Sequence, residues 1–141
     1  MRLTTCMTAL AVCLVLGGCA TQYQSSGFTG GHAESKAPGK LQKVNFYGNG
    51  FIASDTVQKF ALYRCAELAH AGGKPHFLIY DSLMAAALDR PADLPRVGAV
   101  GNKPSAFAFM LLLDAPRAGS KQTQTVLDEL DPVVHPPKAA K

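Results

Sequence analysis

The residues with the clearest chemical potential end an apolar N-terminal run, where Leu16-Gly17-Gly18-Cys19 places a thiol directly after two small residues. Arg2 gives the run a positive start, and the stretch from Met7 to Leu16 is apolar apart from Thr8. A signal peptidase needs small residues before its cut. An ordinary secretory cut does not need cysteine as the first mature residue, so the pattern predicts a cysteine that is itself modified.

This order of residues resembles a bacterial lipobox. The resemblance implies that the Cys19 thiol is alkylated with diacylglycerol, that the chain is cut before it, and that the new amino group is acylated. Each buried methylene adds about 0.8 kcal/mol of membrane affinity, so several acyl chains hold a protein firmly. Residue 20 is Ala rather than Asp, which in Gram-negative lipoproteins usually implies export. We therefore expect a lipid anchor at Cys19 in the outer membrane, with the protein facing the periplasm.

A transmembrane anchor is the alternative for the first eighteen residues. The apolar run from Leu3 to Gly18 is shorter than the roughly 20 residues that cross a bilayer. Polar residues follow at once, without a basic stop-transfer flank. The sequence thus favours a cleaved signal peptide over 1–18, and soluble secretion or an uncleaved anchor are the other interpretations.

Gly48-Asn49-Gly50 is a second candidate site, because it stands between a strand pattern and a helix pattern. Free N–H groups and the helix dipole at such a place can cradle an anion. However, the third glycine of a dinucleotide-binding fingerprint is missing, and no acidic residue stands convincingly at the end of the next strand. The favoured interpretation is a tight turn, in which these residues accept a positive φ.

Further reactive side chains gather on the following helix pattern. Arg64 and Glu67 are three residues apart and can form an ion pair, or a polar contact point for a partner. Cys65 is the one cysteine beyond residue 19, and its small neighbours favour a buried thiol over a reactive one. His70 and His76 flank a Gly-Gly turn, but no second Cys or carboxylate completes a zinc set. The sequence predicts neither a metal nor a cofactor.

Apolar periodicity predicts the elements that position these residues. Residues 19–39 are rich in Gln, Ser, Gly and Thr and predict a flexible lipidated tether. A folded domain is expected over 40–131, with a strand over 41–47. Residues 54–71 have helical spacing between an N-cap serine, Ser54, and Gly72-Gly73, which predicts a helix.

The second half of the chain is expected to complete an α/β (α+β) domain in the order β-α-β-loop-β-α, with helices on a small mixed sheet. A strand over 76–81 should run parallel to the first in a right-handed βαβ unit. Residues 85–104 contain three prolines and predict a surface loop, with a helical turn near 83–88. A strand over 105–114, buried on both faces, a helix over 121–130 and a disordered tail over 132–141 follow. The expected core residues are Val44, Phe46, Phe60, Leu68, Leu78, Phe109 and Leu111.

Composition limits the partners. Charged residues make up 17% of the chain, and loss of Arg2 with the leader lowers the formal net charge of +4 by one. The basic residues are scattered rather than clustered, which excludes nucleic acid as the expected partner. A mild positive balance favours anionic lipid headgroups or the cell wall.

Four segments also resemble a family of small Gram-negative lipoproteins without an assigned activity. The segments are Tyr23-Gln24, Gly30-Gly31-His32-Ala33-Glu34, 44–51 (Val-Asn-Phe-Tyr-Gly-Asn-Gly-Phe) and 60–68 (Phe-Ala-Leu-Tyr-Arg-Cys-Ala-Glu-Leu). The chain departs from the family at His32 and Ala33, where Tyr and Ser are usual, and at Cys65, where a small residue such as Ala is usual. The resemblance implies the lipid anchor and the strand–turn–helix core, and it supplies no catalytic residues.

Three functions are compatible with these patterns. The leading hypothesis is a non-catalytic envelope component that binds another envelope protein or cell-wall material, because no catalytic set of residues is visible. A binding module should show an exposed apolar or aromatic patch around Tyr47, Phe51 and Tyr63. A periplasmic enzyme with its site in the 85–104 loop should show convergent polar groups between that loop and Gly48-Asn49-Gly50. The third hypothesis is a sensor of envelope stress.

Overall fold

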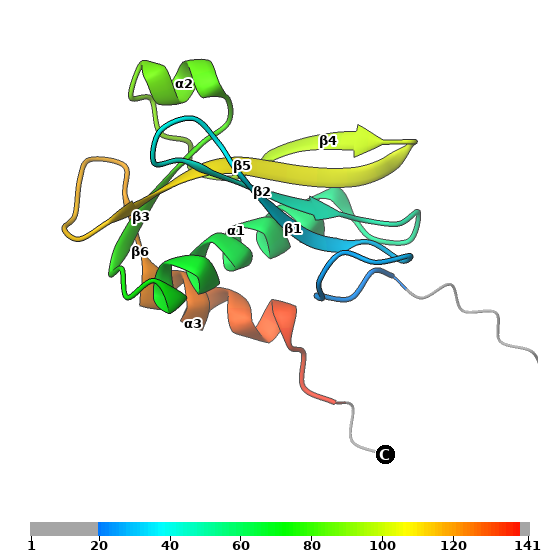
Figure 1. The fold of residues 1–141 in the computed structure, drawn as a ribbon. Coiled ribbons are helices and arrows are strands. Elements are labelled where there is room, and N and C mark those ends of the chain that lie inside the picture. Colours follow the sequence, from blue (N-terminus) through cyan, green and yellow to red (C-terminus); the bar gives the residue numbers. More distant parts are fainter. Residues whose placement is uncertain (1–19, 139–141) are drawn as a thin grey trace, which may run out of the picture.

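The computed structural model describes residues 20–138, so the predicted signal peptide, Cys19 and the last three residues lie outside the described part. Within it, a six-stranded sheet carries α1 (Ser54–Ala71) and α3 (Thr123–Val134) on one face. The short helix α2 (Leu83–Ala87) lies on the opposite side of the sheet (Figure 1). The expected small α+β domain is confirmed. None of the helices in this part is long and apolar enough to span a membrane.

The sheet has the order β1-β2-β5-β3-β6, and β4 pairs with β5 beside this path. Its strands are β1 (Gly31–Lys36), β2 (Gln42–Tyr47), β3 (His76–Tyr80), β4 (Arg96–Val100), β5 (Lys103–Leu113) and β6 (Lys121–Gln122). All of these pairings are antiparallel. Because β2 and β3 are both antiparallel to β5, they run parallel to each other, as predicted, with β5 inserted between them.

Helix α1 has the predicted bounds. Asp55 lies in its first turn, where the helix dipole favours a negative charge, and the helix ends at Ala71 with Gly72 as its C-cap. Its N-cap residue is Ala53 rather than the predicted Ser54, and no side chain caps it. The buried face of α1 includes Ala61, Cys65, Ala66 and Ala69, so its backbone can approach the sheet closely.

Strand β5 corrects two predictions. Ala106, Ala108 and Met110 face the helices and are at most 1% exposed. Phe109 and Leu111, which were predicted in the core, lie on the other face and are only half-buried. The close approach of α1 leaves room for small residues, so the large side chains of β5 point away from it. Of the other predicted core residues, Val44, Phe46, Phe60 and Leu78 are buried, and Leu68 packs at the margin.

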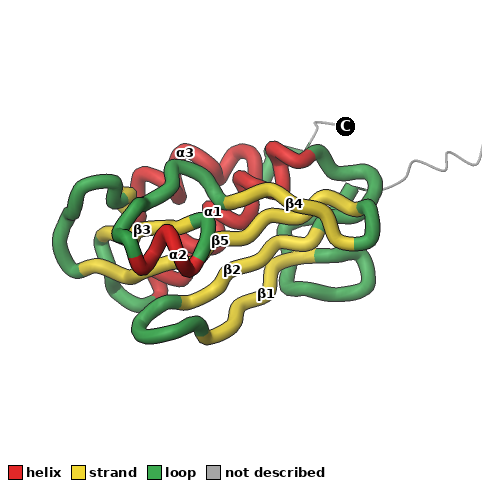
Figure 2. Tube along the Cα trace, turned by 90° about the horizontal axis from the view of Figure 1, so that it is seen from above, coloured by secondary structure: helices red, strands yellow, loops and turns green. Residues whose placement is uncertain are grey.

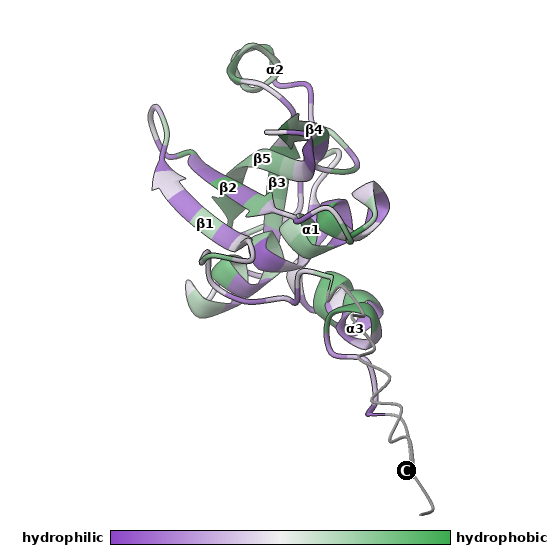
Figure 3. Ribbon diagram, turned by 90° about the vertical axis from the view of Figure 1, so that its right-hand side faces the viewer, coloured by the Kyte–Doolittle hydropathy of each residue, from purple (hydrophilic) through white to green (hydrophobic). Residues whose placement is uncertain are grey.

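The folded domain begins earlier than residue 40. Residues predicted as a flexible tether form β1, and Thr21 is 4% exposed. The tether prediction is wrong here because β1 presents polar His32 and Glu34 toward α1, so it lacks the apolar alternation that marks a strand. Figure 3 shows β1 as largely hydrophilic, whereas β5, on the far side of β2, is largely hydrophobic.

The two remaining differences lie in the second half of the chain. The predicted 85–104 loop contains β4, which joins β5 through a tight turn at Gly101 and Asn102, both with positive φ. Helix α3 continues through Pro132 to Val134, so the first residues of the predicted tail are helical. In α3, tertiary packing overrides the local signal of Pro132. Strand β4 contains no proline, and it was missed because its exposed residues show no apolar alternation.

Candidate functional site

The Gly48-Asn49-Gly50 turn is built by close packing rather than by unusual backbone angles. Neither of its glycines has a positive φ. A Cβ on Gly48 would lie 2.4 Å from Cγ2 of Ile52 and 2.7 Å from the Pro104 carbonyl oxygen. Glycine is therefore required at position 48 by lack of space, which corrects the predicted reason.

Two backbone N–H groups at this turn already have acceptors. The Gly48 N–H donates to the Pro104 carbonyl at 2.8 Å, and the Phe51 N–H donates to Asn49 Oδ1 at 2.9 Å. An anion cradle needs such donors to point outward. The geometry thus favours the structural interpretation of Gly48-Asn49-Gly50.

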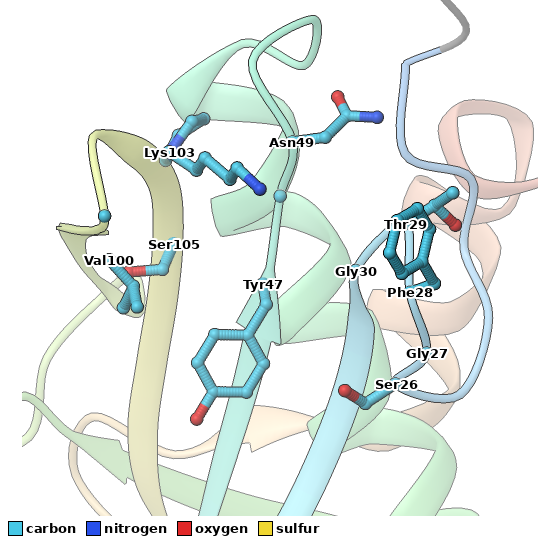
Figure 4. A pocket seen from close by; sticks show the side chains of 13 residues that line it. Ser26, Gly27, Phe28, Thr29, Gly30, Tyr47, Asn49, Val100, Lys103 and Ser105 are labelled. Atoms are coloured by element: carbon cyan, nitrogen blue, oxygen red, sulfur yellow. The ribbon is translucent and has the colours of Figure 1, made fainter.

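A hollow of about 410 Å³ lies beside this turn on the face opposite α1 (Figure 4). It is bounded by the 26–30 hairpin, the end of β2 and the β4–β5 turn. Lys103, Asn49 and Ser105 contribute polar groups to its wall. Among the described residues that line it, none is a His, Cys, Asp or Glu. The wall can therefore donate hydrogen bonds to a small ligand, but it presents no general base.

Arg64 and Glu67 form the predicted ion pair at 3.0 Å, and the structure adds three partners from the N-terminal segment. Arg64 Nε donates to Glu34 Oε1 at 2.6 Å, and the Tyr23 hydroxyl donates to Glu67. His32 Nδ1 lies 2.9 Å from Glu34 Oε1. The sequence reasoning missed these partners because it placed them in a tether. The signal that could have found them is the polar spacing of His32 and Glu34 on one face of a strand.

Tyr23, His32, Glu34, Arg64 and Glu67 form a cluster that we call the polar lock. The pKa shifts within it are those of a structural network of ion pairs and hydrogen bonds. Burial raises the pKa of the Tyr23 hydroxyl, and the carboxylate of Glu67 raises it further, so Tyr23 stays a proton donor. Partial burial raises the pKa of Glu34, but the hydrogen bond and charge of Arg64 outweigh it and hold that pKa below its ordinary value of 4.5. Glu34 is therefore ionised near neutral pH and paired, rather than poised for proton transfer.

The Tyr23 ring joins the N-terminal segment to three elements. It stacks on Phe46 of β2 at 6.1 Å between ring centroids and meets Phe60 and Tyr63 of α1 edge-on at 5.6 and 5.3 Å. It also contacts His135, just after α3, at 6.1 Å. Two residues earlier, the Thr21 hydroxyl donates to the Thr29 carbonyl at 2.8 Å. The chain is thus fixed to the domain from residue 21 onward.

The predicted aromatic patch is present only in part. Phe51 is 68% exposed and Tyr47 is half-buried, but Tyr63 is only 7% exposed because its hydroxyl donates to Asp131 and its ring packs on Tyr23. Phe28, which the sequence did not single out, is fully exposed. The exposed aromatic residues therefore gather at the end of the sheet rather than along α1.

The sheet face opposite α1 and α3 forms a second surface, which we call the open face. Its half-buried side chains are Lys43, Asn45, Phe107, Phe109 and Leu111. Phe107 and Phe109 meet edge-on at 6.1 Å, and Lys43 Nζ lies 4.9 Å from the Phe107 centroid. Figure 2 shows this face with α2 over one end and α1 and α3 behind it.

The remaining candidates from the sequence are not assembled into a site. Cys65 is completely buried, and burial raises the pKa of its thiol to about 12, so it is an inert packing residue. Within residues 20–138 there is no group of three or more His, Cys, Asp or Glu residues that could hold a metal ion.

Searches of protein-family models, curated proteins and solved structures found no match to this chain.

Proposed function

We propose that the protein is a lipid-anchored, non-catalytic component of the outer membrane that binds another envelope protein or cell-wall material. The anchor would be Cys19, at the end of the Leu16-Gly17-Gly18-Cys19 pattern. The fixed position of Thr21 supports this arrangement, because a domain fastened two residues after an anchor stays at the membrane surface.

The open face is the observation that carries the binding role. An antiparallel sheet with one solvated face usually places polar residues on that face. Here β5 instead presents Phe107, Phe109 and Leu111, and the cation of Lys43 lies above the two aromatic rings. Aromatic residues are enriched at the centres of protein interfaces, where they bury large areas at low entropic cost. The open face is therefore the surface that we assign to a partner.

The first test reads the anchor. Mass spectrometry of the N-terminal peptide from purified membranes is expected to find acylated Cys19 as the first residue. A chain that is uncleaved, or cleaved without acylation, would contradict the proposed anchoring.

The second test reads the partner. Crosslinking in intact envelopes should enrich one component with the native chain, and Phe107→Glu should abolish that enrichment. Thr125→Glu is the control, because Thr125 is exposed on α3, on the other side of the sheet from Phe107. Equal recovery with both variants would show that the open face is not the binding surface.

A further inference from the structure

Three turns at one end of the sheet each present an apolar side chain to solvent. They carry Phe28 in the 26–30 hairpin, Phe51 after the Gly48-Asn49-Gly50 turn, and Val100 at the β4–β5 turn. These side chains are 106%, 68% and 56% exposed. The three turns lie together at the right-hand end of Figure 1, and Figure 4 shows Phe28 and Val100 on the rim of the same hollow.

Hydrogen bonds fix the backbone of the two turns that carry Phe28 and Phe51. Gly27 and Gly30 exchange backbone hydrogen bonds of 3.0 and 3.1 Å, so Phe28 stands at the tip of a two-residue turn. Asn49 Oδ1 fixes the backbone of Phe51 at 2.9 Å. Tight turns ordinarily carry Gly, Asn, Asp or Ser at their tips, so a fully exposed Phe there has no local structural reason. A turn whose backbone is already ordered loses less entropy when its side chain is buried against another surface.

The chain reaches the folded domain at this same end. Ala20 and Thr21 line a groove of about 890 Å³ together with Phe51 and the residues that end α3. Cys19 is two residues before Thr21, and two extended residues span at most about 7 Å. A lipid on Cys19 would therefore hold this end of the sheet, and not another part of the domain, against the bilayer.

We infer that the end of the sheet rests on the bilayer that carries the anchor, with Phe28, Phe51 and Val100 inserted at the boundary between headgroups and acyl chains. This inference rests on the proposed lipidation of Cys19. Apolar side chains that enter this boundary strengthen membrane attachment in proportion to the apolar area they bury.

The charges at this end suit anionic headgroups. Lys103 borders the hollow, Lys138 borders the groove, and both are exposed. The long stems of such lysines can lie along apolar surface while their ammonium groups reach phosphate. Asp55, close to Phe51 in the sequence, pairs with Lys59 at 3.5 Å, which offsets its repulsion of anionic lipid. In this orientation the strands point away from the membrane and leave the open face available to a partner.

Tryptophan probes test the orientation directly, because the chain contains no tryptophan. The lipidated full-length variants Phe28→Trp, Phe51→Trp and Met84→Trp are reconstituted in vesicles of phosphatidylethanolamine and phosphatidylglycerol with brominated acyl chains. Met84 is the matched control, because its exposure of 67% equals that of Phe51 within one per cent and it lies on α2. We expect blue-shifted and strongly quenched emission from Phe28→Trp and Phe51→Trp, and unquenched emission from Met84→Trp.

The same preparation separates this inference from the proposed function. Where Cys19 is acylated and all three probes are equally quenched, or none is, the orientation is wrong and the anchoring stands. Where Cys19 is not acylated and the protein does not remain with the vesicles, the anchoring and the orientation both fail.

Discussion

The two faces of β5 show opposite choices of side-chain size. Toward the helices, Ala106 and Ala108 are small and almost completely buried. Toward the open face, Phe107 and Phe109 are large and only half-buried. Large apolar residues ordinarily go to the core, where burial of a Phe contributes about 1.5–3 kcal/mol relative to exposure.

The difference shows that the close approach of α1 decides which face of β5 enters the core. The apolar content of β5 does not, because both of its faces are apolar. The small buried residues of α1 bring its backbone close to the sheet, and β2 supplies the large ring of Phe46 instead. The aromatic residues on the open face then add little to the folded domain itself. Four measurements would break or sharpen this contrast.

The largest contrast is expected in thiol reactivity. Cys65 lies on the covered side at 0% exposure with its pKa raised to about 12, so the native protein should react with a thiol reagent only after unfolding. A Phe107→Cys variant places a second thiol on the open face. In a chain without residues 1–18 and with Cys19→Ser, we expect that second thiol to react more than about a thousandfold faster than Cys65. Comparable rates in a titration followed by absorbance would mean that the covered side opens readily.

Truncation of a ring should separate the two faces in stability. Phe46→Ala removes a fully buried ring and should lower the free energy of unfolding by about 3–5 kcal/mol. Phe107→Ala removes a half-buried ring and should cost about 1 kcal/mol. Urea denaturation followed by circular dichroism measures both values. Equal losses would show that the open face contributes to the core after all.

Loss of the polar lock at the edge of the covered face should have a smaller effect. Arg64→Met leaves Glu34 and Glu67 without their shared cation, and we expect a loss of about 1–2 kcal/mol. Lys59→Met is the control, because its exposed pair with Asp55 should contribute only a few tenths of a kcal/mol. Urea denaturation of the two variants measures both losses of stability. Similar losses would show that the polar lock contributes no more than an ordinary surface ion pair.

The smallest effect is expected in the pH dependence of stability. The pKa of Glu34 is lower in the folded state than its ordinary value of 4.5, because the contribution of Arg64 outweighs that of partial burial. The stability that this carboxylate contributes is therefore complete above that value and is lost as pH falls through the folded-state pKa. Arg64→Met should lose less stability on acidification than the native chain. The measurement is the free energy of unfolding of both proteins as a function of pH. Equal losses on acidification would show that Glu34 is not coupled to Arg64.

Local patterns predicted the strand and helix that surround the Gly48 turn, because β2 and α1 have strong apolar periodicity and clear stop signals. Strand β1 was not predictable in this way, since its side chains toward α1 are polar: Glu34 pairs with Arg64, and His32 pairs with Glu34. Prolines flank β4 on both sides, which favoured a loop. Its five residues are all exposed, so the sequence shows no alternation of apolar and polar residues there.

The candidate sites show the same limit. The pairing of Arg64 with Glu67 follows from helical spacing, whereas the participation of Tyr23 depends on a contact 44 residues away in the sequence. The sequence could not show which side of β5 faces α1, because the even-numbered and the odd-numbered residues of this strand are both apolar. Phe28 stood in an apparent linker, where an exposed aromatic residue carries no pattern at all.

The central place of β5 sets the order in which the molecule can assemble. Strands β2 and β3 come earlier in the sequence, but they are joined in one sheet only by β5, which lies between them. Strand β5 also pairs with β4. Until residue 113 is available, the first half of the chain has a helix and a hairpin but no continuous sheet to cover. Such late, non-local closure slows folding relative to chains with local contacts. This late closure would suit the passage across a membrane in extended form that the proposed anchoring at Cys19 requires.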